Sequence, residues 1–246
     1  MQKICIIIPC YNEERRFDQN SFIKFLDANP SYEFCLVNDG SKDRTADILN
    51  ELAGRYDRRI SVLDLKDNVG KAEAVRKALL FCEEKALYDY IGYIDADFSA
   101  PLSEINHMLA FCNGELTHFI IGGSRIKRLG ANILRKPSRH YLGRIFATFG
   151  GWILKLPVYD SQCGLKLIKA EVVRQLFSEP FITKWLFDLE LLFRLRNIVG
   201  PETVNSKSLE IPLNEWVEKG GSKITLFNFL RVPYDLLRIH YKYNRS

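Results

Sequence analysis

The sequence has no uninterrupted apolar stretch of ~18 residues, which is about the length that a membrane-spanning helix requires. Its six cysteines include no C-x-x-C pair and no zinc-site spacing, so we interpret them as reduced thiols of a cytosolic protein. No signal peptide precedes Ile4, where the first apolar run begins. Internal repeats, low-complexity segments and linker-like stretches are also missing. The 246 residues therefore favour one domain, or one domain with an elaborated end.

A strong excess of one charge is missing as well. The net charge is +5, with 47% apolar and 26% charged residues, as in a soluble globular protein with a sizeable core. So small a charge does not indicate nucleic-acid binding. Acids are nevertheless absent from residues 116–159, which contain eight Lys or Arg. Residues 219–246 hold six Lys or Arg against the single acid Asp235.

Apolar runs and helical patterns alternate through the first half of the chain. The runs are rich in β-branched and aromatic residues and predict strands at residues 4–8, 34–37, 60–65, 90–94 and 119–121. The amphipathic patterns predict helices at residues 14–26, 45–56, 71–85 and 102–112. This alternation predicts an α/β fold with a Rossmann-like, mostly parallel sheet, whose ligands bind at the carboxyl ends of the strands.

Acidic turns follow several of these predicted strands. Asp95 and Asp97 form a D-x-D pair, an oxygen-rich site that suits Mg²⁺ or Mn²⁺ carrying substrate phosphates. A solvated loop that caps the next helix is the alternative. The turns at residues 11–13 and 39–41 are by themselves equally compatible with ordinary turn and helix-start chemistry.

Together, these motifs resemble the family-2 inverting nucleotide-sugar glycosyltransferases. The matching motifs are P-x-Y-N-E at residues 9–13, V-x-D-G-S at 37–41 and D-x-D at 95–97. The resemblance covers at least residues 4–125 and implies the A-type glycosyltransferase fold. Further segments are similar to the dolichyl-phosphate β-glucosyltransferases and related polyprenyl-phosphate enzymes: residues 68–76, D-S-Q-C-G-L-K at 160–166, W-L-F-D-L-E at 185–190, and Trp216 with G-S-K at 221–223.

The resemblance implies a role for each matched residue. The nucleotide would be bound by Pro9, Tyr11, Asn12, Glu13, Val37, Asp39, Lys71, Asp95 and Ala96. The metal ion would be held by Asp97, with Asp95 and Ser99. Phosphate oxygens of the donor or the acceptor would be contacted by Arg125, Lys166, Ser222 and Lys223. The catalytic residues would be Asp188, Asp97 and Arg125.

The sequence departs from the family pattern in three places. Asn38 replaces the first Asp of a D-D-G-S turn, and Ala72 and Glu73 replace glycines after Lys71. Ser99 stands where phosphomannosyl relatives carry a Gln metal ligand, so water is an alternative ligand there.

Asp188 has three interpretations. It is the candidate base for a hydroxyl acceptor. A lipid phosphate is already an anion near neutral pH and needs no base, in which case Asp188 would position the sugar. The third interpretation is a carboxylate at the start of a helix over residues 189–195.

The end of the chain predicts an amphipathic basic helix from Arg231 onward, with Pro233 in its first turn. Its polar positions are Arg231, Asp235, Arg238, Lys242 and Arg245, and its apolar stripe is Leu230, Tyr234, Leu237 and Tyr241. Such a helix either packs its Leu/Tyr face on the domain or lies on an anionic membrane. Residues 116–159, which contain no acid, are either a flexible loop that meets the acceptor or a solvated basic loop.

We therefore expect a catalytic domain at residues 1–222 and membrane-surface helices at 223–246. The expected reaction is metal-dependent, with Mg or Mn, and transfers glucose from UDP-glucose to a polyprenyl or dolichyl phosphate. The enzyme would be peripheral on the cytosolic membrane face, without a nucleic-acid partner and in an undetermined oligomeric state. Alternatives are a GDP-mannose donor, a saccharide hydroxyl acceptor, or a non-enzymatic nucleotide-sugar or membrane-binding protein.

Overall fold

A computed structural model describes residues 3–112, 116–135, 148, 150–151, 155–219 and 226–243. The strands are β1 (Ile4–Cys10), β2 (Tyr32–Asp39), β3 (Ile60–Leu65), β4 (Tyr90–Ile94), β5 (Ile120–Ser124), β6 (Asn132–Leu134), β7 (Leu165–Lys169), β8 (Ser208–Pro212) and β9 (Glu215–Val217). The helices are α1 (Gln19–Ala28), α2 (Thr45–Arg55), α3 (Lys71–Glu83), α4 (Ser103–Phe111), α6 (Ala170–Phe177), α7 (Phe187–Val199), α8 (Pro201–Lys207) and α9 (Leu226–Tyr243).

The predicted mostly parallel sheet is confirmed. Seven strands lie in the order β3-β2-β1-β4-β7-β5-β8, and only β7 runs antiparallel to its neighbours β4 and β5. A separate pair joins β6 to β9. The strand order reverses between β1 and β4, which is where ligands bind in open α/β sheets.

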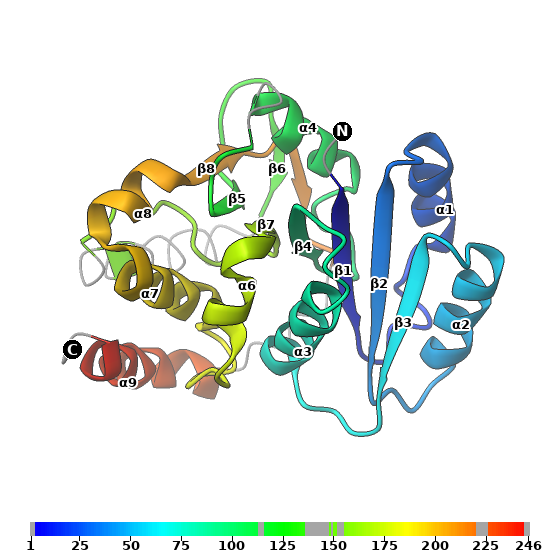
Figure 1. Ribbon diagram of the computed structural model, residues 1–246, viewed down its shortest axis with the longest axis horizontal. Helices are drawn as coiled ribbons and strands as arrows, with labels where there is room; N and C mark the ends of the chain where they lie inside the picture. The colour runs from blue at the N-terminus through cyan, green and yellow to red at the C-terminus, as the bar shows by residue number, and fades with distance from the viewer. Residues whose placement is uncertain are drawn as a thin grey trace.

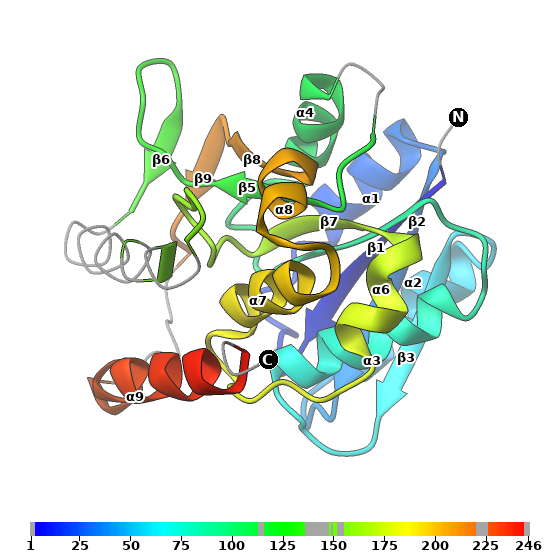
Figure 2. The ribbon, with the colours of Figure 1, turned by 60° about the vertical axis from the view of Figure 1, so that its left-hand side comes forward.

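Two apolar layers cover the sheet, because successive residues of a strand point to opposite faces. Ile6 and Ile8 of β1 pack in the layer formed with α1, α2 and α4. Cys5 and Ile7 pack in the other layer, with α3, α6 and α7. Figures 1 and 2 show the resulting arrangement, with α9 beside α7 at the lower side of the molecule.

All six cysteines are free and buried, as the sequence predicts for reduced core thiols. Cys5 of β1 and Cys82 of α3 place their sulfur atoms 3.7 Å apart. Burial raises the pKa of the Cys163 thiol to about 11, which favours the neutral form.

The first helix begins later than predicted, at Gln19 instead of residue 14. The Glu13 carbonyl accepts hydrogen bonds from the N–H groups of Arg16 and Phe17, which closes a turn before the helix. Asp18 then caps the helix by accepting from the Ser21 N–H at 3.0 Å. The acidic and basic residues of this segment therefore belong to a loop at the carboxyl end of β1.

The last helix begins earlier than predicted. It starts at Leu226, so Pro233 lies inside the helix and not in its first turn. Pro233 lacks an N–H and removes one helical hydrogen bond at this point. The predicted boundary between residues 222 and 223 lies outside the described residues. No helix among the described residues is long and apolar enough to span a membrane.

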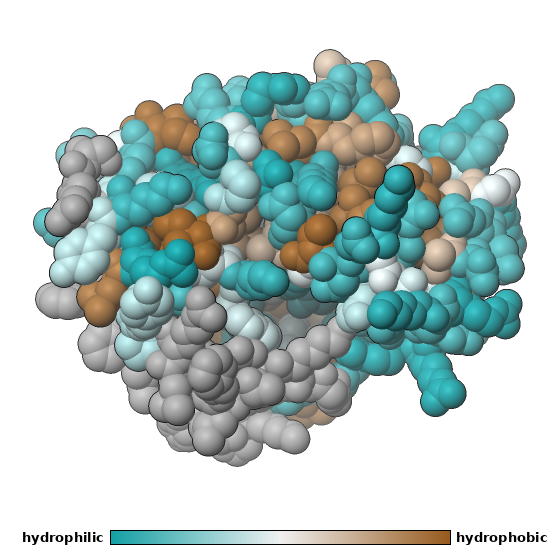
Figure 3. Space-filling model, turned by 90° about the horizontal axis from the view of Figure 1, so that it is seen from below, coloured by the Kyte–Doolittle hydropathy of each residue, from teal (hydrophilic) through white to brown (hydrophobic). Residues whose placement is uncertain are grey.

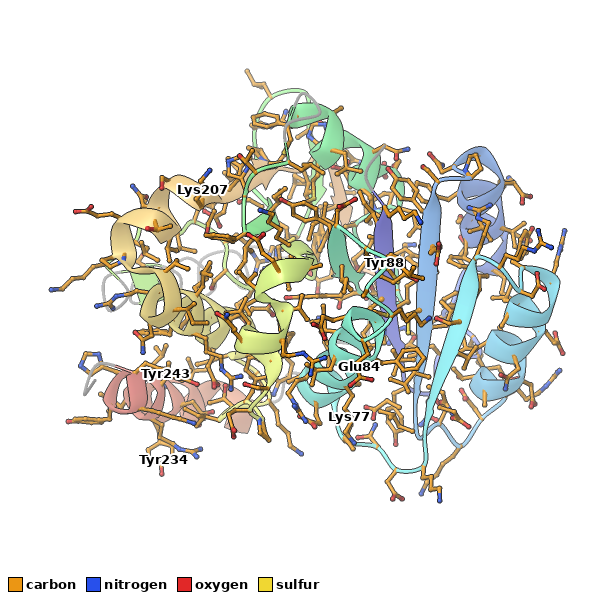
Figure 4. All side chains as sticks on the ribbon, in the orientation of Figure 1. Lys77, Glu84, Tyr88, Lys207, Tyr234 and Tyr243 are labelled. Carbon is orange, nitrogen blue, oxygen red and sulfur yellow. The ribbon has the colours of Figure 1, made fainter. Side chains whose placement is uncertain are left out.

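The face by which α9 packs differs from the predicted Leu/Tyr stripe. Leu236 and Ile239 are buried in the same core layer as α7. The Tyr243 hydroxyl donates to Glu190 of α7 at 2.8 Å. Tyr234 and Tyr241 are instead about 60% exposed, and Figure 4 shows Tyr234 and Tyr243 on opposite sides of the helix. The helix therefore joins the domain core and still presents an apolar outer face.

Candidate active site

The candidate site lies at the carboxyl ends of β1, β2 and β4. Because β7 is antiparallel, it begins at this same edge, with Leu165 paired to Ile94. The D-S-Q-C-G-L-K segment that leads into β7 is thereby brought beside the D-x-D pair, although about 65 residues separate them in sequence. One antiparallel strand thus joins two distant motifs at one edge.

The loops after β1 and β2 are locked to each other. The Asn12 N–H donates to the Ser41 hydroxyl at 3.1 Å, and the Lys42 N–H donates back to the Asn12 side chain at 2.8 Å. Asn12 has a φ of 53°, a left-handed conformation that asparagine tolerates better than most residues. The Glu13 N–H donates to Thr45 at 2.8 Å. The two loops that resemble nucleotide-binding motifs therefore form one unit.

Asp39 holds the loop that precedes α3. Its carboxylate accepts from the N–H groups of Val69 at 2.8 Å and Gly70 at 3.0 Å, and from the Asn68 amide at 3.1 Å. Burial raises its pKa, and these hydrogen bonds oppose the rise. Gly40 beside it has a φ of +65°, and a Cβ there would overlap the backbone of residues 67 and 68. The residues around Asp39 place Lys71 at the site.

The replacement of the first Asp of the turn by Asn38 has a direct explanation. The Asn38 amide donates to Asp64 of β3 at 2.6 Å, and its oxygen accepts from the Ser41 N–H at 3.0 Å. An ionised aspartate at position 38 could not donate to Asp64 and would add a like charge beside it. Asn38 is therefore matched to its neighbouring strand.

Asp95 is paired with Lys71, which comes from the first residue of α3. Burial disfavours the charged lysine, but the carboxylates of Asp95 and Asp188 outweigh this effect and raise the pKa of Lys71. A Cβ added at Gly164 would overlap the Asp95 carboxylate. Glycine in the D-x-Q-C-G motif thus gives Asp95 the space in which it meets Lys71.

Asp97 has two donors. The Arg16 guanidinium approaches one carboxylate oxygen at 3.3 Å, and the Ser99 N–H donates to the other at 2.9 Å. Arg16 also lies 3.5 Å from Glu13. Each carboxylate of the D-x-D pair is therefore matched by a basic side chain from another element.

Arg125 and Asp160 form a two-bond ion pair. The guanidinium donates twice at 2.7 Å, and the Arg125 N–H adds a third bond at 3.0 Å. Burial opposes ionisation of Asp160, but Arg125 outweighs it and lowers the pKa of Asp160 from 3.8 to about 2. Trp216 lies 5.4 Å from this guanidinium. The pair fixes the segment before β7 to the end of β5.

Asp188 lies in a buried cluster. One of its oxygens accepts from the Lys166 ammonium at 2.7 Å and from the Tyr93 hydroxyl. Lys166 spends its other donors on the carbonyls of Ser161 and Cys163, at 2.9 and 2.6 Å. Burial and the neighbouring Asp188 charge raise the pKa of Tyr93 far above its usual range. The cluster ties α7 to β4 and β7.

Residues 5–177 match the family described as glycosyl transferase family 2. The chain belongs to this family. A dolichyl-phosphate beta-glucosyltransferase of Dictyostelium discoideum is 29% identical over 98% of this chain and 74% of the relative. One from Trichomonas vaginalis is 31% identical over 95% of this chain and 69% of the relative, and the human one is 28% identical over 98% and 76%.

Solved structures support the fold of this family 2 glycosyltransferase. Glucosyl-3-phosphoglycerate synthase from Mycobacterium tuberculosis, in complex with Mn²⁺, UDP and glucosyl-3-phosphoglycerate, has a TM-score of 0.70 at 17% identity. The match covers 98% of this chain and 80% of that chain. The same synthase with Mn²⁺, UDP-glucose and phosphoglyceric acid has a TM-score of 0.66 at 17% identity, over 98% and 80%. The predicted A-type glycosyltransferase fold is confirmed.

Two predicted phosphate contacts of the glycosyltransferase are engaged by protein oxygens. Lys166 is 3% exposed, and its three N–H donors are all used by protein oxygens, so it has none left for a phosphate. Arg125 directs its guanidinium at Asp160 and is held there by two bonds. Both residues hold neighbouring segments of the site in place through these bonds. Ser222 and Lys223, the other two predicted phosphate contacts, lie outside the described residues.

The residues predicted to bind the nucleotide differ in how far they are buried. The side chain of Val37 is fully buried under α3, so a ligand contact would come from its main chain. Ala96 and Ser99 are also buried, at 5% and 7% exposure. Pro9 and Tyr11 are partly buried at the end of β1. Their predicted roles toward a nucleotide, and that of Ser99 toward a metal, stay predictions.

Sequence reasoning missed Arg16, Tyr93 and Asp160 as partners of predicted site residues. Arg16 stands in a run of charged residues without a distinctive pattern. Tyr93 lies within a strand and reads as a core residue. Asp160 belongs to the recognised D-S-Q-C-G-L-K motif, but nothing in this motif indicates that Arg125 is its partner.

The site fits a divalent metal through the carboxylate oxygens of the D-x-D pair. Asp95 and Asp97 offer carboxylate oxygens, which Mg²⁺ and Mn²⁺ prefer, and their side chains are 41% and 24% exposed. Within the described ranges, no group of three His, Cys, Asp or Glu could hold a metal. These two acids therefore suit a metal that takes its other ligands from substrate phosphates and water.

Proposed function

We propose that this protein transfers glucose from UDP-glucose to a polyprenyl or dolichyl phosphate, with inversion at the sugar and with a divalent metal ion. The relatives named dolichyl-phosphate beta-glucosyltransferases support this assignment, because they align over nearly the whole chain. The motifs at residues 160–166 and 185–190 support it as well, since they join the D-x-D pair at one edge of the sheet.

The observation that carries the acceptor class is the environment of Asp188. The carboxylate is 3% exposed and one oxygen already accepts from Lys166 and Tyr93. That oxygen is held by two protein donors, so it is not free to take a proton from a hydroxyl acceptor. A hydroxyl acceptor needs such a base, whereas a phosphate monoester reacts as an anion. The arrangement therefore favours a phosphate acceptor, and Asp188 would position groups around the sugar.

The leaving diphosphate gains negative charge as the sugar bond breaks. A bound divalent metal would neutralise part of this charge, held by Asp97 with Asp95. Lys71 lies at the N-terminus of α3 with its ammonium at Asp95, so it would add a fixed positive charge beside the phosphates. Arg125 and Lys166 would act indirectly, by fixing the segments that face the donor.

The acceptor lipid implies a membrane, and α9 supports a location on its cytosolic face. The outer face of α9 combines Tyr234, Leu237 and Tyr241 with Arg238 and Lys242. Aromatic and basic residues on one helix face suit the headgroup region of an anionic bilayer. Figure 3 views the molecule from this side, where hydrophobic residues lie in patches among hydrophilic ones over the left and central parts.

A test is the release of UDP from UDP-glucose by the full chain with Mn²⁺, with and without a polyprenyl phosphate in detergent. We expect release to depend on both the lipid phosphate and the metal, and Asp97→Ala to abolish it while the protein stays folded. Equal release in EDTA, or release that requires a saccharide in place of the lipid phosphate, would contradict the proposal.

A further inference from the structure

One basic side chain contacts a carboxylate that fits a metal. Arg16 comes from the loop after β1 and contacts Asp97 at 3.3 Å and Glu13 at 3.5 Å. Lys71, at the start of α3, forms an ion pair with Asp95, the other carboxylate of the D-x-D pair. Both carboxylates that fit a metal are thus neutralised by the protein's own cations. Arg16 has no place in the predicted nucleotide or metal sets.

We propose that Arg16 is a positioning residue that competes with the metal ion for Asp97 and thereby couples metal binding to nucleotide binding. The inference rests on the proposed function for the identity of the nucleotide and the metal.

Charge explains the competition. A dication and a guanidinium at one carboxylate repel each other, so the metal can bind Asp97 fully only when Arg16 moves away. Without nucleotide, the Arg16 guanidinium is paired with two carboxylates, Glu13 and Asp97, and these ion pairs keep it at Asp97. The Arg16 side chain is 35% exposed, so it has room to turn.

A nucleoside diphosphate changes this balance in two ways. Its phosphate oxygens would supply further metal ligands, since no group of three His, Cys, Asp or Glu among the described residues could hold a metal. They also offer the guanidinium a planar, two-oxygen partner of the kind that arginine binds well. Metal and nucleotide should therefore each increase the affinity of the protein for the other, by the same factor.

The chain offers a matched control. Arg15 is adjacent, has the same charge, and is exposed. Arg15→Gln and Arg16→Gln change the net charge equally and almost at the same place. Only the second removes the contact with Asp97.

The test measures Mn²⁺ binding by electron paramagnetic resonance, with and without saturating UDP, in the full chain and without any acceptor. In the wild type, UDP should tighten Mn²⁺ binding. In Arg16→Gln, Mn²⁺ alone should bind about fivefold more tightly than in the wild type, the upper range for a partly exposed ion pair, and the effect of UDP should shrink. Arg16→Lys should fall between the two, and Arg15→Gln should resemble the wild type.

The outcomes separate this inference from the proposed function. If Arg16→Gln and Arg15→Gln bind Mn²⁺ alike with and without UDP, the competition is wrong, whatever the transfer assay gives. If Arg16→Gln weakens Mn²⁺ binding in the absence of UDP, Arg16 supports the metal site instead of competing for it, which also overturns the inference. If glucose transfer fails but the coupling pattern is found, the inference stands and the proposed reaction does not.

Discussion

At the scale of single residues, the space around Asp95 depends on Gly164. A methyl group at this position would overlap the carboxylate that pairs with Lys71. We expect Gly164→Ala to displace Asp95 and to lower kcat/KM about tenfold to a hundredfold, because small displacements in a site are costly. The measurement is steady-state UDP release at saturating metal.

Gly54 of α2 provides the control for this substitution. A Cβ added there meets nothing within 4 Å. Gly54→Ala should therefore keep full activity and stabilise the helix by up to ~1 kcal/mol. Full activity in Gly164→Ala would mean that the position of Asp95 does not limit the reaction.

The pair of Arg125 and Asp160 predicts a pH dependence of stability. Folding lowers the pKa of Asp160 from 3.8 to about 2, so its ionised form is favoured in the folded state. Its contribution, roughly 2 kcal/mol, is fully present above the unfolded pKa and is lost as the pH falls through the folded pKa. Between pH 5 and pH 3 the wild type should lose about 1 kcal/mol more than Asp160→Asn.

Urea unfolding at several pH values checks this slope. The absolute stability of Asp160→Asn will also drop, because Arg125 loses its partner. The double variant Arg125→Gln with Asp160→Asn should recover part of that drop and keep the flatter slope. A single variant with the slope of the wild type would show that Asp160 does not carry this dependence.

Some residue roles could be predicted from the sequence and others could not. The D-x-D pair comes directly after β4, and Asp39 is the last residue of β2, so their place at the edge follows from the topology. The partners of Lys166 and Arg125 could not be predicted, because a lysine in a motif says nothing about how many of its donors protein oxygens already use. The carboxylates that pair with them, Asp188 and Asp160, lie 22 and 35 residues away.

At the scale of elements, α9 has two faces with different tasks. Val232, Leu236, Ile239 and Tyr243 recur at steps of four, three and four and lie toward α7. The sequence contains a second stripe with Tyr234, Leu237 and Tyr241, which is exposed. Periodicity reveals both stripes but does not say which faces the core, and the prediction named only the Leu/Tyr stripe, leaving open whether it packs on the domain or lies on a membrane.

The outer face of α9 predicts salt-sensitive membrane binding. Arg238 and Lys242 would contribute about 1 kcal/mol each near an anionic bilayer, so the binding should be reversible. We expect the protein to sediment with anionic liposomes at low salt and to leave them at high salt. Leu237→Ser with Tyr241→Ser should weaken this binding several-fold without loss of stability, since both side chains are exposed.

Leu87→Ser is the matched control for the liposome assay. Leu87 is 51% exposed, like Leu237, but lies near the amino ends of β1 and β4, where Lys3 bonds to Asp89. This variant should bind liposomes like the wild type. If the α9 variant did so too, the membrane contact would have to lie elsewhere.

The strand β7 is one of several elements that the sequence did not predict, together with β6, β8, β9, α6 and α8. Its residues L-K-L-I-K alternate only briefly, and its pairing with β4 and β5 joins segments far apart in the chain. The motif before it was recognised, but its insertion between two parallel strands depends on tertiary packing. The first four βα units, in contrast, carry long local patterns and were predicted within a few residues apart from the start of α1.

At the scale of the whole molecule, ligand binding should stabilise the fold. A ligand at a hundred times its Kd adds about 2.7 kcal/mol to the free energy of unfolding. We expect UDP with Mn²⁺ to raise the Tm by several degrees, and GDP with Mn²⁺ to raise it less. A larger shift with GDP would assign the donor to the guanosine nucleotides.

The six buried thiols can report local unfolding of the protein through their reaction with a thiol reagent. A reagent such as a chromogenic disulfide can reach them only after the surrounding structure separates, and the thiols lie in several parts of the fold. Cys5, Cys35 and Cys82 would report the separation of α3 from the sheet, Cys112 the end of α4, and Cys163 the segment beneath the D-x-D pair. Labelling rates followed by mass spectrometry would thus rank local stabilities without any introduced probe, and would show which part a donor nucleotide closes.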